Sequence, residues 1–185
     1  LSQHKDLPRQ PLTASIPIST REKQIEHTYG NQVGSLCVSL CTHIDDPVER
    51  LQAIHRSTLN AKIDFEDTSG GRIADFIGLL PPFAVRAIGK YSRKLSEQGK
   101  SPSYNVIVSN VPGPRGALFD DYMAMSEFYS IGPVLEGVGL NITAWSFRDN
   151  LSFSILSCFR AVAEPWEIER LLKESLKHLL EATQQ

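Results

Sequence analysis

Two stretches near the start of the chain alternate apolar and polar residues, which is the pattern of a strand with one covered face. The first spans residues 11–19 and the second spans residues 34–42. Their alternating apolar positions are Leu12, Ala14, Ile16 and Ile18 in the first, then Leu36, Val38 and Leu40 in the second. Both stretches therefore predict half-buried strands, and Pro17 places the first near an edge or an end of its sheet.

Helical periodicity follows in three places. Asp46, Pro47 and Glu49 predict a helix start, because an aspartate can accept backbone N–H groups and proline suits the first helical position. The apolar stripe of this helix is Val48, Leu51, Ile54, Thr58 and Leu59. A second helical region is predicted over residues 73–95 and a last helix over residues 166–182. The last helix carries an apolar side made of Ile168, Leu171, Leu172, Leu176, Leu179 and Leu180.

The second half of the chain otherwise predicts strands. Residues 106–108 form a continuous β-branched run, as expected of a central strand covered on both faces. Further strands are predicted near residues 122–129 and over residues 138–147. A turn at residues 148–150 leads into residues 151–158 and predicts an antiparallel hairpin. Helices and strands in this mixed order predict an α/β fold with a mixed sheet flanked by helices.

Composition narrows the class of protein. With 185 residues, 41% of them hydrophobic, the chain can form one α/β unit or half of a larger two-lobed protein. Its net charge of -2, without a basic stripe, argues against nucleic-acid binding.

Cys37 and Cys41 would lie roughly 13 Å apart in a strand, so they are too far apart for a disulfide. Free thiols in a reducing cytoplasm are therefore expected. No window approaches the ~20 apolar residues of a membrane span. The chain begins at Leu1, so upstream sequence is expected.

The sequence Ser-Asn-Val-Pro-Gly-Pro at residues 109–114 follows the predicted central strand. Pro112 and Pro114 stiffen the exit from that strand, and Gly113 lets the backbone turn or lets a ligand approach. Ser109 and Asn110 then stand at the strand end, where polar side chains often face a cleft. A turn that simply closes the strand is the competing interpretation.

A pair of glycines marks the segment before the predicted hairpin. Gly137 and Gly139 share one face of an extended segment and would leave a groove for an acyl chain or a neighbouring backbone. Asn141 is the next polar residue on the same side. A bulge or a local twist of the strand is the competing interpretation.

Residues that could form a self-contained active site are not recognisable in the sequence. The five histidines lack a nearby acidic partner and nucleophile, so a structural role is expected for each. Cys41 and His43 alone supply two ligands where zinc needs three or four, so no metal is expected. The sequence also lacks a Gly-x-Ser-x-Gly elbow and a glycine-rich phosphate loop.

Taken together, five segments resemble the wax ester synthase/diacylglycerol acyltransferase family, in the same order and over nearly the whole chain. SNVPGP followed by GVGLN is the most specific part. The segments are PLTASIPISTR at residues 11–21, YGNQVG at residues 29–34, DPVERL at residues 46–51, SNVPGP at residues 109–114 and YSIGPVLEGVGLN at residues 129–141.

The resemblance implies a chloramphenicol-acetyltransferase-like fold, in which two similar lobes face each other across a tunnel. Residues 1–185 would form the C-terminal lobe. The family transfers a fatty acyl group from coenzyme A to a long-chain alcohol or diacylglycerol, making wax esters or triacylglycerol, and needs no cofactor beyond its acyl-CoA substrate. A histidine of an HHxxxDG motif in the N-terminal lobe removes the hydroxyl proton. This sequence holds no His-His pair, so the catalytic base is expected from an N-terminal lobe outside it, and the segment alone is expected to be inactive.

Within that frame, this half of the protein is expected to supply the second wall of the substrate site. Ser109 and Asn110 would lie near the reaction centre. The predicted substrate-binding residues are Ser109, Asn110, Pro112, Gly113, Pro114, Gly137, Gly139 and Asn141. The expected partners are the N-terminal lobe, acyl-CoA and the acceptor alcohol, with peripheral contact to a membrane or lipid inclusion as a further expectation.

Two other functions stay open on the sequence. The chain could be a non-catalytic lipid-binding or interaction lobe that keeps the fold without the chemistry. It could also be half of a condensation-type acyltransferase that uses carrier-protein thioesters and shares the lobe architecture.

Overall fold

The fold is given by a computed structural model, in which the described residues are 10–20, 33–67, 81–84, 86–87, 90, 104–116, 118–120, 123–135, 138–162 and 164–183. Most of the predicted second helical region, residues 73–95, lies outside them, and so does Gly137. No helix among the described residues is long and apolar enough to cross a membrane.

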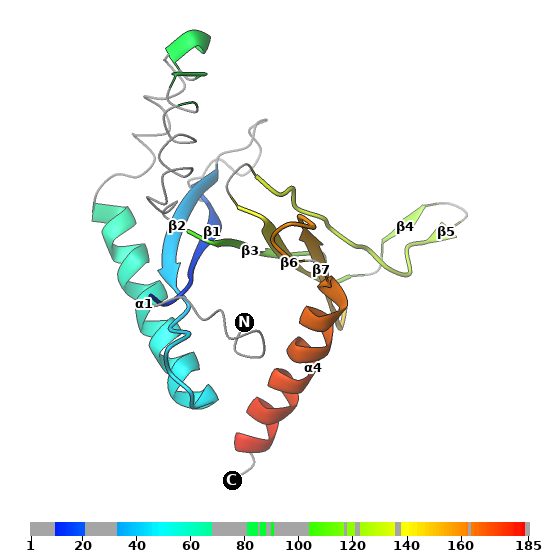
Figure 1. The fold of residues 1–185 in the computed structure, drawn as a ribbon. Helices are drawn as coiled ribbons and strands as arrows, with labels where there is room; N and C mark the ends of the chain where they lie inside the picture. Colours follow the sequence, from blue (N-terminus) through cyan, green and yellow to red (C-terminus); the bar gives the residue numbers. More distant parts are fainter. Residues whose placement is uncertain are drawn as a thin grey trace.

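A five-stranded mixed sheet forms the centre of the molecule (Figure 1). Its strand order is β2-β1-β3-β6-β7. The strands are β1 (Thr13–Ser19), β2 (Val33–Ser39), β3 (Val106–Pro112), β6 (Leu140–Phe147) and β7 (Asn150–Ser157). β1 pairs with β2, and β6 with β7, in antiparallel fashion, whereas β3 runs parallel to both of its neighbours. The β-branched run at residues 106–108 is thus confirmed as part of the central strand.

Local sequence signals explain where several elements begin and end. The Asp46 carboxylate accepts the backbone N–H groups of Val48 and Glu49 at 2.9 and 2.8 Å, which caps the helix α1 (Pro47–Asp67) as predicted. The hairpin turn between β6 and β7 is confirmed as well, and Arg148 adopts a left-handed φ of 54° there. The last helix, α4 (Pro165–Ala182), begins one residue before the predicted range 166–182, with a proline in its first turn.

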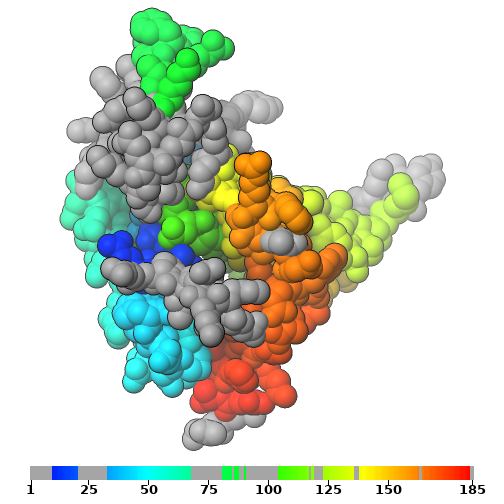
Figure 2. Space-filling view, in the orientation of Figure 1, coloured from blue at the N-terminus to red at the C-terminus, as the bar shows by residue number. Residues whose placement is uncertain are grey.

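Both long helices lie on the same side of the sheet, α1 next to β2 and α4 next to β7 (Figures 1 and 2). α1 approaches β2 closely, because a Cβ at Gly34 would lie 2.5 Å from the Phe65 ring. The Ser57 hydroxyl also accepts the Ser39 N–H at 3.1 Å.

The packing face of α1 matches the predicted stripe in part. Val48, Ile54 and Thr58 are half-buried, as predicted, whereas Leu51 and Leu59 are about half exposed, at 52% and 48%. The other half-buried residues of α1 are Pro47, Arg50, Ala53, Ser57, Ala61 and Phe65. Small and polar residues join the packing face because β2 approaches closely, so hydrophobicity alone did not report them.

One predicted strand is much shorter than expected. In place of a strand over residues 122–129, the structure has a two-stranded hairpin of β4 (Phe119–Asp120) and β5 (Met123–Ala124), which projects away from the five-stranded sheet (Figure 1). Residues 125–135, here named the cover segment, then run without regular strand pairing up to the isolated bridge of Leu135 with Val138. The cover segment is held by side chains rather than by a backbone ladder, which sequence periodicity does not report.

The two faces of the five-stranded sheet carry different side chains. The helix face is the one toward α1 and α4, and its most buried residues are Ala14, Leu36, Val38 and Val106. The pocket face is the opposite one, and its most buried residues are Ser15, Ile107, Asn141, Thr143 and Phe147. Strand alternation and the pairing register assign each residue to its face. One face is hydrocarbon, whereas the other buries hydroxyl and amide groups.

Candidate functional site

A cavity of about 270 Å³ lies on the pocket face, between the sheet and the cover segment, and is named here the sheet pocket. Its lining residues are Pro17, Ile107, Ser109, Val111, Ser130, Gly132, Pro133, Leu135, Asn141 and Thr143. β1, β3 and β6 form the floor, and the cover segment forms the roof. Residues of the two segments that most resemble the acyltransferase family, at 109–114 and 129–141, therefore meet at one cavity.

Parallel pairing of β3 with β6 brings these segments together. Ile107 lies opposite Asn141 in the register, and Ser109 lies opposite Thr143. Paired residues of neighbouring strands point to the same face, so the three polar side chains of the strands gather at the pocket floor.

Asn141 and Thr143 are satisfied within the protein. Asn141 is 3% exposed, and its Nδ2 donates to the Pro133 carbonyl at 2.8 Å. Its Oδ1 accepts the Thr143 hydroxyl at 3.0 Å. Buried polar groups need such partners, because an unpaired one costs about 1–3 kcal/mol.

Ser109 differs from these two residues. It is half-buried and lines the sheet pocket, and its hydroxyl makes no hydrogen bond with any described residue. A hydroxyl can donate one hydrogen bond and accept two. Ser109 therefore offers its full hydrogen-bonding capacity to whatever occupies the pocket.

Asn110 does not share this pocket. It follows Ser109 in β3, so its side chain points to the helix face, where it is exposed. The two side chains therefore lie on opposite faces of the sheet, and the expectation that both meet one reaction centre stays a prediction. Pro112 falls on the same face as Asn110, opposite Ser146, and is exposed.

The close approaches at two predicted glycines are made by protein atoms. A Cβ at Gly113 would lie 2.0 Å from the Ser146 carbonyl oxygen, and the Gly113 N–H donates to the Ser146 hydroxyl at 3.1 Å. A Cβ at Gly139 would lie 2.3 Å from the Ala161 Cβ. Both glycines are thus needed for packing within the chain, and the sheet pocket is lined by neither.

Pro114 is exposed, and its carbonyl accepts the Arg148 N–H at 3.1 Å, which ties the Ser-Asn-Val-Pro-Gly-Pro turn to the β6–β7 hairpin. Gly137 lies outside the described residues.

No titratable side chain is among the described residues that line the sheet pocket. The shifted pKa values belong to exposed groups elsewhere. The pKa of Tyr129 is raised because its hydroxyl donates to the Glu127 carboxylate at 2.7 Å, and the pKa of Arg170 is raised by its contacts with Glu167 and Glu174. Within the part of the chain that the structure describes, no three metal-ligating side chains come together. The described lining residues offer hydroxyl and amide groups for hydrogen bonds, but none of them accepts a proton at neutral pH.

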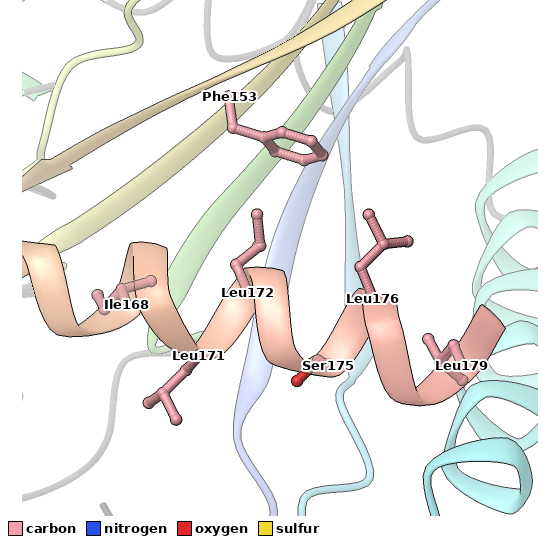
Figure 3. A pocket seen from close by; sticks show the side chains of 7 residues that line it. All are labelled: Phe153, Ile168, Leu171, Leu172, Ser175, Leu176 and Leu179. Carbon is pink, nitrogen blue, oxygen red and sulfur yellow. The ribbon is translucent and has the colours of Figure 1, made fainter. Parts of the chain in front are cut away.

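A second, larger cavity of about 400 Å³ lies on the helix face, and is named here the α4 groove (Figure 3). Its lining residues are Phe153, Ile168, Leu171, Leu172, Ser175, Leu176 and Leu179. Phe153 extends from β7 toward α4, and Leu172 and Leu176 point back toward it (Figure 3). The described residues that line the α4 groove supply one hydroxyl, at Ser175, and otherwise hydrocarbon, so the sheet pocket is the better candidate for chemistry.

Sequence reasoning missed five pocket residues that could have been found. Thr143 follows Asn141 in the strand alternation, and Ser130, Gly132, Pro133 and Leu135 belong to a segment already singled out for its resemblance. These four residues reach the pocket because the cover segment folds back over the sheet, which no local pattern reports.

The chain is similar to known proteins of one family. The family model described as WS/DGAT C-terminal domain matches residues 29–180. A Mycobacterium tuberculosis protein with a provisional diacylglycerol O-acyltransferase name is 34% identical over 180 residues, which cover 97% of this chain and 39% of that protein. The O-acyltransferase WSD of Acinetobacter baylyi is 30% identical over 178 residues, covering 96% of this chain and 37% of that protein.

The solved structure of a wax ester synthase/diacylglycerol acyltransferase from Marinobacter aquaeolei matches with a TM-score of 0.65 and 22% identity, over 97% of this chain and 39% of that one. This likeness confirms the predicted chloramphenicol-acetyltransferase-like α/β fold. The chain spans about two fifths of the length of the relatives it matches.

Proposed function

Because the chain belongs to the WS/DGAT family, as its C-terminal domain, we propose that it is the C-terminal half of an acyl-CoA-dependent O-acyltransferase. The whole protein transfers a fatty acyl group from coenzyme A to a long-chain alcohol or diacylglycerol. The products are a wax ester or a triacylglycerol, together with free coenzyme A.

The observation that carries this proposal is the unpaired Ser109 hydroxyl in a largely apolar cavity. Hydrocarbon side chains of Pro17, Ile107, Val111 and Leu135 surround it. An apolar pocket with few polar groups is the usual environment for an aliphatic ligand that carries one reactive polar centre. A long acyl or alkyl chain that ends in a thioester or a hydroxyl has this chemistry.

In the proposed reaction, the hydroxyl oxygen of the acceptor attacks the thioester carbonyl carbon. A new C–O bond forms, the C–S bond breaks, and the hydroxyl proton passes through a base to the leaving thiolate of coenzyme A. The described pocket residues include no such base. The base therefore comes from the N-terminal part of the protein, where the family resemblance implies the histidine of an HHxxxDG motif.

In this scheme Ser109 donates a hydrogen bond to the thioester oxygen as negative charge develops on it. Donors placed toward a developing oxyanion stabilise the transition state more than the ground state. The apolar walls exclude water and hold the chain, so this half of the protein binds and stabilises while the other half moves the proton.

The experiment measures product formation by the full-length protein with labelled palmitoyl-CoA and either hexadecanol or dioleoylglycerol. We expect one ester and one free coenzyme A per turnover. Alanine at the HHxxxDG histidines should abolish ester formation.

The same protein is also tested with a palmitoylated carrier protein. Ester formation from the carrier thioester alone would instead support a condensation-type acyltransferase. Tight lipid binding without transfer from either donor would support a non-catalytic lipid-binding lobe.

A further inference from the structure

Among the described residues, side chains attach the cover segment to the sheet at two points. At one point the Phe128 ring packs on the Trp145 ring, with centroids 4.6 Å apart and planes inclined by 32°. At the other point the Asn141 Nδ2 donates to the Pro133 carbonyl. The first contact is hydrophobic and partly exposed, whereas the second is a buried, directional hydrogen bond at the pocket itself.

The orientation of the Asn141 amide is set by its neighbours. The Thr143 hydroxyl donates to Oδ1 at 3.0 Å, so Oδ1 faces the strand and Nδ2 faces the cover segment. This arrangement leaves the amide one way to satisfy both partners. Asn141 therefore acts as a spacer of defined length between β6 and Pro133.

Because Gly132 has no side chain, the cover segment can approach the Asn141 amide closely. A Cβ at Gly132 would lie 2.6 to 2.9 Å from the amide atoms of Asn141. Any larger residue at this position would push either the amide or the cover segment away. The roof of the sheet pocket thus rests directly on the Asn141 side chain.

We propose that Asn141 is a positioning residue that fixes the height of the cover segment above β3, and so sets the width of the sheet pocket and the alkyl chain that it accepts. The identity of that chain rests on the proposed function. In this role Asn141 does not touch the reacting atoms. It differs from Ser109, which is free to contact the substrate directly.

The sharpest variant is Asn141→Asp, which keeps the shape of the side chain while it replaces the Nδ2 donor with an acceptor and adds a negative charge. The aspartate can still accept from Thr143, but it places an oxygen against the Pro133 carbonyl oxygen. Repulsion between the two acceptors should lift the cover segment. Asn150→Asp is the matched control, because Asn150 is exposed at the β6–β7 turn.

The first measurement is amide hydrogen exchange in the full-length protein, which does not depend on activity. We expect exchange in peptides covering residues 125–138 to become about tenfold faster in Asn141→Asp, as expected for the loss of one buried hydrogen bond. Peptides from β1 and β2 should be unchanged, and Asn150→Asp should match the wild type throughout.

The second measurement is the chain-length profile of ester formation with acyl-CoA and alcohols from C8 to C18. A raised cover segment should shift the preferred chain by two or more carbons, and this shift is the result that tests the positioning role. If Asn141→Asp does not fold, Thr143→Val takes its place, because it frees the amide to rotate without adding a charge.

The outcomes separate this proposal from the proposed function. Faster exchange of the cover segment in a protein that makes no ester upholds the positioning role and overturns the acyltransferase. Unchanged exchange in an active enzyme overturns the positioning role alone. A large loss of kcat with an unchanged chain-length profile and unchanged exchange would make Asn141 a direct catalytic contact instead.

Discussion

The two faces of the five-stranded sheet are built from the same strands but use opposite chemistry. On the helix face, buried residues such as Leu36 and Val38 are hydrocarbon and pack toward the helix layer. On the pocket face, Asn141 and Thr143 are as deeply buried, yet they are polar and hydrogen-bonded. The helix face therefore contributes stability and borders an apolar groove, whereas the pocket face combines stability with a cavity that polar side chains line.

This difference separates a face that serves packing from a face with a candidate binding site. Hydrocarbon burial is non-directional, so the helix face tolerates an open groove at α4. Buried polar groups must meet partners at set distances, so the pocket face has a defined shape around Ser109. Substitutions in the sheet pocket should consequently lower activity, whereas substitutions on the helix face should lower stability.

The largest expected effect is on activity, from Ser109→Ala on the pocket face. Loss of a donor to the developing oxyanion should lower kcat/KM by about 100-fold in the full-length enzyme, with little change in melting temperature. Asn110→Ala, one position along on the helix face, should cost less than about tenfold. Steady-state kinetics on both variants checks this.

Ser152→Ala is the matched serine control, because it lies on the pocket face but outside the cavity lining. If Asn110→Ala lowers kcat/KM more than Ser109→Ala does, the reaction takes place on the helix face and the roles assigned to the two faces are reversed.

The next effect is on stability, from Val38→Ala on the helix face. Val38 is fully buried, so removing two methyl groups should cost about 2 kcal/mol from lost transfer energy and the cavity left behind. The melting temperature of the full-length protein should fall by about 4–8 °C while kcat/KM holds. Differential scanning calorimetry provides the measurement.

Cys37→Ala supplies the control for Val38, because the neighbouring Cys37 is exposed on the other face of β2. It should change stability by less than about 0.5 kcal/mol. Equal losses of stability in Val38→Ala and Cys37→Ala would mean that the pocket face of β2 is also covered.

The smallest effect is expected at the solvent side of α4. Lys173 and Glu169 form an exposed i,i+4 ion pair at 2.6 Å. Such pairs contribute about 0.3–0.5 kcal/mol, so Lys173→Ala should lower the melting temperature by no more than about 2 °C. The difference should disappear at 1 M salt, where exposed charges are screened. A decrease in melting temperature that persists in high salt would indicate that the hydrocarbon part of the Lys173 side chain stabilises α4 by packing.

Much of the fold could be predicted because its signals are local. Strand alternation located β1 and β2, and Asp46 with Pro47 located the start of α1. The turn after Phe147 predicted the β6–β7 hairpin. The cover segment escaped prediction because it is held by Asn141 and Trp145, which lie later in the chain, rather than by strand pairing.

The candidate site was predicted in part. Ser109 and Asn141 were chosen from motifs, and both line the sheet pocket. Asn110, Gly113 and Gly139 were chosen with them, yet one points to the helix face and the two glycines pack against protein atoms. A motif identifies neighbours in sequence, but in a strand those neighbours face opposite sides of the sheet.

By itself, the sequence determined the family, the alternation of each strand and the absence of a His-His pair from this chain. Only the tertiary structure decided which polar residues are buried and that Ser109 and Asn141 share a cavity. The physical reason is that β3 and β6 pair side by side although they are far apart in the chain, and the cover segment folds back over them. Burial and polar partners are properties of that long-range pairing, so no local pattern contains them.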